Sequence, residues 1–87
     1  MKRYKQNSVV LAASMGDELG MLNQMTGMYF VLDSIGNDVW NILSVKSNIH
    51  EIVDTLLGEY DVTKERCEHD IAILLDDMIE KNIIIEV

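Results

Sequence analysis

Met28-Tyr29-Phe30-Val31-Leu32 is the stretch that decides the fold, and Asp33-Ser34-Ile35 follows it without a break. Its five residues are all apolar, two are aromatic and one is β-branched, and a Thr26-Gly27 turn precedes them, so they predict a β-strand. Asp33 and Ser34 are both common caps of helix N-termini. Apolar side chains then recur at helical spacing, at Ile35, Val39, Ile42 and Leu43. A strand is therefore expected to lead directly into a helix over about residues 34–44, and the rest of the chain must pack around that corner.

Length, charge and cysteine content limit what the chain can be. Its 87 residues allow one small domain over residues 1–87, with residues 1–7 expected as a short mobile tail. The formal charge of −8 argues against nucleic acid and against anionic membrane surfaces. The single cysteine, Cys67, excludes an internal disulfide and suits a reducing, cytoplasmic location. No stretch reaches the length of a membrane span. The acidic surface either keeps a small protein soluble or matches a basic partner.

Two more strands are expected before the strand Met28–Leu32. Residues 8–14 and 18–24 form short runs, and turns near Gly16 and Gly27 separate the three runs, as in an antiparallel meander. A period of two places Met28, Phe30 and Leu32 on one face of the third strand, and we assign this face to the core. The other face then carries Tyr29 and Val31.

Two helices are expected after the first. One begins at Ser47 or Asn48 and ends at Gly58, and Glu51 can complete a capping box. The longest runs from the cap Thr63 to Lys81, with Asn82 as a left-handed stop. The apolar stripes of the two helices are Ile49, Ile52, Val53, Leu56 and Leu57 in the first, and Cys67, Ile71, Leu74, Leu75 and Met78 in the second. Residues 83–85 are expected to pack back or to add a short strand. Three antiparallel strands followed by three helices predict an α+β fold resembling a winged helix-turn-helix.

The residue pattern does not indicate a catalytic site. The one adjacent carboxylate pair, Asp76-Asp77, points about 100° apart on a helix. Cys67 and His69 lie two residues apart on the same helix, so their side chains diverge and cannot share a metal ion. No phosphate-binding loop, nucleophile elbow or dinucleotide fingerprint is present. We therefore predict no enzyme activity, no catalytic residues, no metal and no cofactor.

A binding function remains, and the longest helix decides between nucleic acid and peptide. It carries three basic residues against six acidic ones, which would repel phosphate. Ile73 is flanked by Asp70 and Asp77, which indicates either a solvated face with a single exposed isoleucine or the wall of a groove with an acidic rim. If the strand Met28–Leu32 lies at the sheet edge beside this helix, a peptide can add to it as a further strand.

The sequence resembles the PqqD-like family, the recognition elements that bind precursor peptides of ribosomally made, modified natural products. Residues 27–33 and 36–43 carry the resemblance, together with Ile49-x-x-Ile52-Val53, Tyr60-Asp61-Val62, and the spacing from Asp70 to Ile84. The resemblance covers about residues 8–86. Within the family, the sequence most resembles the stand-alone leader-binding proteins of lasso peptide clusters. Asn82 stands where many members have glycine.

The resemblance implies a non-catalytic function. Family members bind the leader segment of a precursor peptide between the third strand and the third helix, and in lasso systems they present it to a transglutaminase-like leader peptidase, beside a separate ATP-dependent cyclase. Carried over to this chain, the peptide-binding residues would be Met28, Tyr29, Phe30, Val31 and Leu32 on the strand, and Arg66, Asp70, Ile73, Leu74 and Asp77 on the helix. The alternatives left open are a winged-helix DNA-binding regulator and a carrier of the quinone-cofactor precursor peptide.

Overall fold

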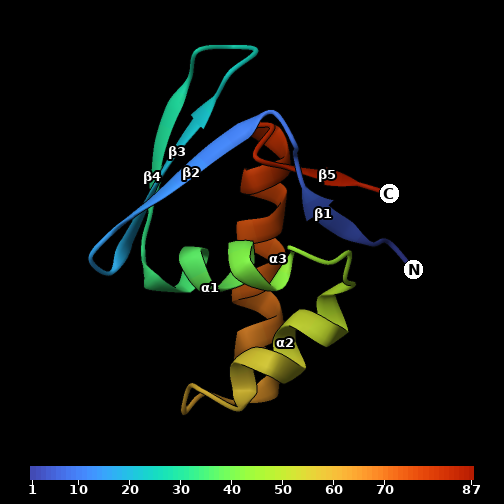
Figure 1. The fold of residues 1–87 in the computed structure, drawn as a ribbon. Helices are drawn as coiled ribbons and strands as arrows, with labels where there is room; N and C mark the ends of the chain where they lie inside the picture. The colour runs from blue at the N-terminus through green and yellow to red at the C-terminus, as the bar shows by residue number, and fades with distance from the viewer.

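The computed structural model describes residues 1–87 and contains two small sheets and three helices. Strands β2, β3 and β4 form an antiparallel sheet in that order, and β1 pairs with β5 in a separate two-stranded sheet. The three helices lie to one side of the larger sheet, with α3 running through the middle of the molecule (Figure 1). The predicted α+β fold with a winged helix-turn-helix arrangement is confirmed.

The larger sheet is the expected meander. It consists of β2 (Val10–Met15), β3 (Glu18–Asn23) and β4 (Tyr29–Leu32), so the predicted third strand is β4. Gly16 (φ 69°) and Gly27 (φ 74°) adopt left-handed conformations in the two turns, which an L side chain rarely tolerates. In the register, Leu22 lies opposite Tyr29 and Leu19 opposite Leu32. Because directly opposed residues share a face, this register fixes which side chains of β4 enter the core.

The helices begin at the predicted caps. Asp33 caps α1 (Ser34–Ile42) by accepting a hydrogen bond from the Gly36 amide at 2.9 Å. Asn48 and Glu51 form a complete capping box at α2 (Ile49–Leu57), and Thr63 caps α3 (Lys64–Glu80). At the other end of α3, Asn82 has a φ of 58°, as expected for a left-handed stop.

The core lies between the inner face of the meander and the helices. It contains Leu19 and Met21 from β3, Val39 and Leu43 from α1 and its end, and the predicted apolar stripes of α2 and α3. The assignment of Met28 to the core face is wrong, because Met28 is 54% exposed. Ile35, the first of the apolar residues at helical spacing in α1, is also 40% exposed. Met28 precedes β4 at the open side of the sheet, and Ile35 lies in the first turn of α1, so the packed core reaches neither position.

The N-terminal residues differ from the expected mobile tail. Tyr4–Gln6 form β1, which pairs with β5 (Ile84–Glu86), and the Tyr4 amide donates to the Ser47 carbonyl at 2.8 Å. The isoleucine-rich C-terminal run has strand propensity but needs a partner for its backbone. The first residues of the chain supply this partner strand. The local charge pattern of residues 1–7 could not reveal the pairing. The predicted short C-terminal strand is confirmed.

The junction between β4 and α1 generates a stability prediction. A Cβ at Gly36 would lie 2.8 Å from the Leu32 Cβ, so Gly36→Ala should destabilise the fold by about 1–3 kcal/mol, despite the better helix propensity of alanine. Gly58→Ala is the matched control, because its Cβ would meet nothing closer than a carbonyl oxygen at 3.4 Å. Urea denaturation of both variants checks this, and equal midpoints would contradict the close packing at Gly36.

Candidate functional site

One edge of β4 has no partner strand. The sheet order β2-β3-β4 leaves β4 paired on one side only, as the peptide-addition hypothesis requires. The Asn23 amide donates to the Met28 carbonyl at 2.9 Å. Because hydrogen-bonding direction alternates along an antiparallel strand, the backbone groups of Phe30 and Leu32 then face β3. The amides and carbonyls of Tyr29 and Val31 face the open edge.

A groove runs between β4 and α3, which we call the β4–α3 groove. At one end the Lys81 Nζ lies 5.4 Å from the centre of the Phe30 ring. A hollow of about 380 Å³ opens there, lined by Thr26, Met28, Phe30, Asp77, Glu80, Lys81 and Asn82. Ile73, which is 58% exposed, lies one turn nearer the N-terminus of α3 than Asp77, on the same side of the helix. This face of α3 therefore carries an exposed apolar side chain between Asp70 and Asp77.

An apolar pocket lies at the opposite end of α3, next to the start of α1. Its volume is about 80 Å³, and its lining residues are Ile35, Leu56, Tyr60, Val62, Cys67, Asp70 and Ile71. Asp70 belongs to this pocket and Asp77 to the hollow beside Phe30. Since Asp70, Ile73 and Asp77 follow one another at helical spacing, a single face of α3 connects the two depressions.

The rim of the groove is not purely acidic, which corrects the expectation from the sequence. Arg66 Nε lies 3.4 Å from Asp70 Oδ2, and Lys81 Nζ lies 2.9 Å from Asp77 Oδ2. Both pairs join residues four apart on α3, so each carboxylate has a basic neighbour on its own helix. Exposed pairs of this kind add little stability, but they leave this part of the rim close to neutral.

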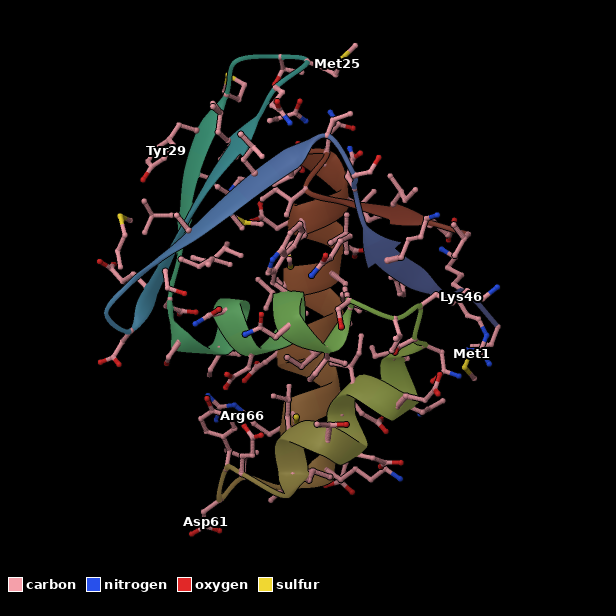
Figure 2. The ribbon with its side chains drawn as sticks, in the orientation of Figure 1. Met1, Met25, Tyr29, Lys46, Asp61 and Arg66 are labelled. Atoms are coloured by element: carbon pink, nitrogen blue, oxygen red, sulfur yellow. The ribbon has the colours of Figure 1, made fainter.

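The predicted site residues fall into distinct positions. Tyr29 and Val31 are exposed, and their side chains point away from the helices, as the labelled Tyr29 shows in Figure 2. Leu32 is only 7% exposed and Leu74 packs against the core, so neither presents much side chain to the groove. Met28, Phe30 and Asp77 line the hollow at one end of the groove, and Arg66 and Asp70 line a shallow depression at its far end. Ile73 lies on the exposed face of α3 between these two ends.

The sequence-based prediction missed several lining residues. Lys81 is four residues beyond Asp77, so its place on the groove face follows from helical spacing, but the sequence analysis includes it only as a basic residue at the end of the helix. Ile35 belongs to the apolar series of α1, so helical spacing does not distinguish it from core residues. Tyr60 and Val62 lie in the connection to α3, where no periodicity marks the exposed side. These residues become recognisable only when α1 and the α2–α3 connection are placed together.

Tyr60 closes the small pocket through a hydrogen bond to α1. Its hydroxyl donates to the Asp38 carboxylate, linking the connection after α2 to α1. This hydrogen bond, reinforced by burial and by the charges of Asp38 and Glu59, raises the pKa of Tyr60 above its ordinary value. Burial likewise raises the pKa of the Cys67 thiol, which keeps this pocket residue protonated and unreactive at neutral pH.

No three His, Cys, Asp or Glu residues gather where a metal ion could be held. None of the helices combines the length and the apolar character that crossing a membrane demands. The open edge and the groove are the features with the geometry of a binding site.

Residues 18–84 match the family described as coenzyme PQQ synthesis protein D (PqqD). The chain belongs to the PqqD family. Among solved structures, it is similar to TbiB1 in complex with the TbiA(beta) leader peptide, with 32% identity, a TM-score of 0.85, and coverage of 92% of this chain and 93% of that one. It also shares the fold of lasso peptide synthetase B1 complexed with the leader peptide, at 20% identity and a TM-score of 0.82 over 94% and 96% of the two chains. No curated protein matches it.

The Tyr60–Asp38 contact in this PqqD-family chain generates a pH prediction. Between the ordinary tyrosine pKa of about 10 and the raised value, the unfolded chain loses the Tyr60 proton while the folded chain keeps it. The contribution of this contact to stability is therefore complete below pH 10 and declines as pH rises further. Asp38→Asn should lower the Tyr60 pKa toward its ordinary value. Phenolate absorbance at 295 nm, taken as the difference from Tyr60→Phe, measures it, and an unchanged titration midpoint would contradict the assignment.

Proposed function

We propose that this protein binds the leader segment of a ribosomally made precursor peptide by strand addition to β4. The open edge of β4 beside the β4–α3 groove is the observation that carries the proposal. The similarity to TbiB1, whose structure holds a leader peptide, supports the same ligand class. An apolar edge strand of this kind also invites aggregation unless something covers it.

The strand register specifies how a guest peptide would be held. Tyr29 and Val31 each offer one amide and one carbonyl, which give a guest up to four main-chain hydrogen bonds independent of its sequence. Side chains alternate along a strand, so every second guest residue points under the sheet toward α3. Met28, Phe30 and Ile73 offer these residues apolar contacts, and the contacts provide selectivity.

The pathway assignment is supported by the resemblance to the leader-binding proteins of lasso peptide clusters and by the similarity to TbiB1. We infer that the protein acts by presenting its guest to enzymes. Within the proposal these are a transglutaminase-like leader peptidase and an ATP-dependent cyclase of lasso peptide biosynthesis, in the cytoplasm. The family description favours a second candidate, the precursor peptide of coenzyme PQQ. The two candidates share a mechanism and differ in the peptide, so titrating both labelled leaders against the chain separates them.

Hydrogen exchange tests the strand-addition geometry. In the free protein, the amides of Tyr29 and Val31 should exchange faster than those of Phe30 and Leu32, which face β3. A saturating leader peptide should slow exchange at Tyr29 and Val31 selectively. Residue-resolved exchange by NMR measures this directly. If the leader binds and the Tyr29 and Val31 amides keep their free exchange rates, the guest does not add to β4.

Substitution of Ile73 tests the helix side of the groove. Ile73→Asp removes an apolar contact and adds charge at an exposed position, so leader affinity should fall severalfold while the fold persists. Ala72→Asp is the matched control: it places the same residue on the same helix, about 100° round from Ile73. Fluorescence polarisation gives the affinities and circular dichroism the folding. Equal leader affinities for the two variants would show that Ile73 does not contact the leader.

A further inference from the structure

Asn23 carries the only buried side-chain amide of the protein, and it lies at one end of the β4–α3 groove. It is the last residue of β3 and is only 2% exposed, so water does not compete for its polar atoms. Its Nδ2 donates to the Asn82 carbonyl at 3.3 Å. Its Oδ1 accepts hydrogen bonds from the amides of Met25 at 2.9 Å and Thr26 at 3.2 Å. A buried amide bonded in this way holds its partners in a defined arrangement.

The backbone of Asn23 is bonded to the residues that lead into the open strand. Its amide donates to the Met28 carbonyl at 2.9 Å, and its carbonyl accepts from the Gly27 amide at 2.8 Å. Because β4 begins at Tyr29, these bonds close the β3–β4 turn directly before the open edge. Asn23 therefore determines the conformation of the turn from which β4 starts.

The Asn82 carbonyl belongs to the opposite wall of the groove. Asn82 follows Lys81, the C-cap of α3, and its φ of 58° turns the chain away from the helix axis. The β3–β4 turn and this end of α3 lie at the same end of the molecule (Figure 1). Thr26 from the turn and Asn82 both line the hollow beside Phe30. The Asn23–Asn82 hydrogen bond therefore joins the two walls of the groove at this end.

This hydrogen bond is the only one between the larger sheet and α3. No other joins residues 10–32 to residues 64–83. Apart from the contact between Lys81 and the Phe30 ring, the sheet and the helix meet through apolar packing in the shared core. Apolar packing is non-directional, so it holds the two elements together without fixing how one is placed along the other. A directional hydrogen bond supplies that missing constraint.

We propose, building on the leader-binding function, that Asn23 is a positioning residue whose hydrogen bond to Asn82 sets the spacing between β4 and α3. A guest strand on β4 must place its inward side chains against α3. A displacement of one wall therefore misaligns the main-chain bonds and the side-chain contacts of the guest together. Asn23 acts on the guest only through these walls, because its own side chain is buried.

A simpler function for Asn23 is to stabilise the β3–β4 turn alone, and the two functions use different atoms. Asn23→Asp keeps an oxygen acceptor for the Met25 and Thr26 amides, but an ionised carboxylate cannot donate to the Asn82 carbonyl. Asn7→Asp is the matched control. The Asn7 Nδ2 donates to the same carbonyl at 2.9 Å, from the segment between β1 and β2 and not from the larger sheet.

The first measurement is leader affinity by fluorescence polarisation, with the labelled leader of the lasso precursor encoded in the same gene cluster. Asn23→Asp should weaken leader affinity about three- to tenfold, the effect of one net hydrogen bond. Asn7→Asp should bind as the unaltered chain does. Asn23→Ser is a second variant without a buried charge: its hydroxyl can accept from the turn amides but is too short to reach Asn82, so the same loss is expected. Circular dichroism checks folding.

Lys81 reports the spacing of the walls without any peptide. Its Nζ lies 5.4 Å from the centre of the Phe30 ring, so the ring current should shift the NMR resonances of its terminal methylene protons. In Asn23→Asp and Asn23→Ser these resonances should move toward those of a free lysine. In Asn7→Asp they should stay in place.

Either of two results would overturn the inference. One is equal leader affinity for the Asn23 variants and for Asn7→Asp, because the Asn82 carbonyl would then matter only for the C-terminal turn. The other is a set of Lys81 resonances that the Asn23 variants leave unchanged. An unaltered chain that binds no leader removes the proposed function instead, and the Lys81 resonances still decide whether Asn23 sets the spacing.

Discussion

The structure depends on a sheet that ends at β4 with its outer backbone groups unpaired. Directly after Leu32, Asp33 caps α1 and turns the chain out of the sheet plane. The chain therefore cannot continue the meander with another strand. Because unpaired backbone groups at an apolar edge are costly to bury and prone to foreign pairing, the edge is stable only if it remains hydrated or is given a guest.

The last strand of the protein is kept away from this edge. Residues 83–85 have a sequence suited to pairing with β4, yet β5 pairs with β1. The left-handed Asn82 redirects the chain at the end of α3, and the Ile83 amide closes the turn on the Met78 carbonyl at 2.9 Å. The side-chain amides of Asn7 and Asn23 both donate to the Asn82 carbonyl, at 2.9 and 3.3 Å. These contacts tie the C-terminal turn to the N-terminal strands, so the chain cannot fill its own groove.

Local pattern was enough to predict the elements, and long-range pairing accounts for the errors. The turns at Gly16 and Gly27, the caps at Asp33, Asn48 and Thr63, and the helical stripes each depend on neighbours within a few residues. They formed as predicted, except that Ile35 at the start of the first stripe is exposed. The partnership of β1 with β5 joins residues some 80 positions apart, and no periodicity encodes it. The groove rim was misjudged for a related reason. Charges were counted along the helix, whereas the pairing of Asp70 with Arg66 and of Asp77 with Lys81 depends on side-chain geometry.

The open edge of β4 could be predicted only in part from local pattern. Alternation alone could place Phe30 and Leu32 against the core, but it could not order the strands in the sheet. In the observed strand order, successive residues of β4 point their side chains and backbone groups in different directions. The side chains of Phe30 and Leu32 point inward, and their backbone groups face β3. The backbone groups of Tyr29 and Val31 face the open edge, and their side chains point away from the helices. A substitution at Tyr29 or Val31 therefore alters an exposed side chain together with the conformation of the open edge. Ile73 lies on a different element, α3, so a substitution there does not alter the backbone of this edge.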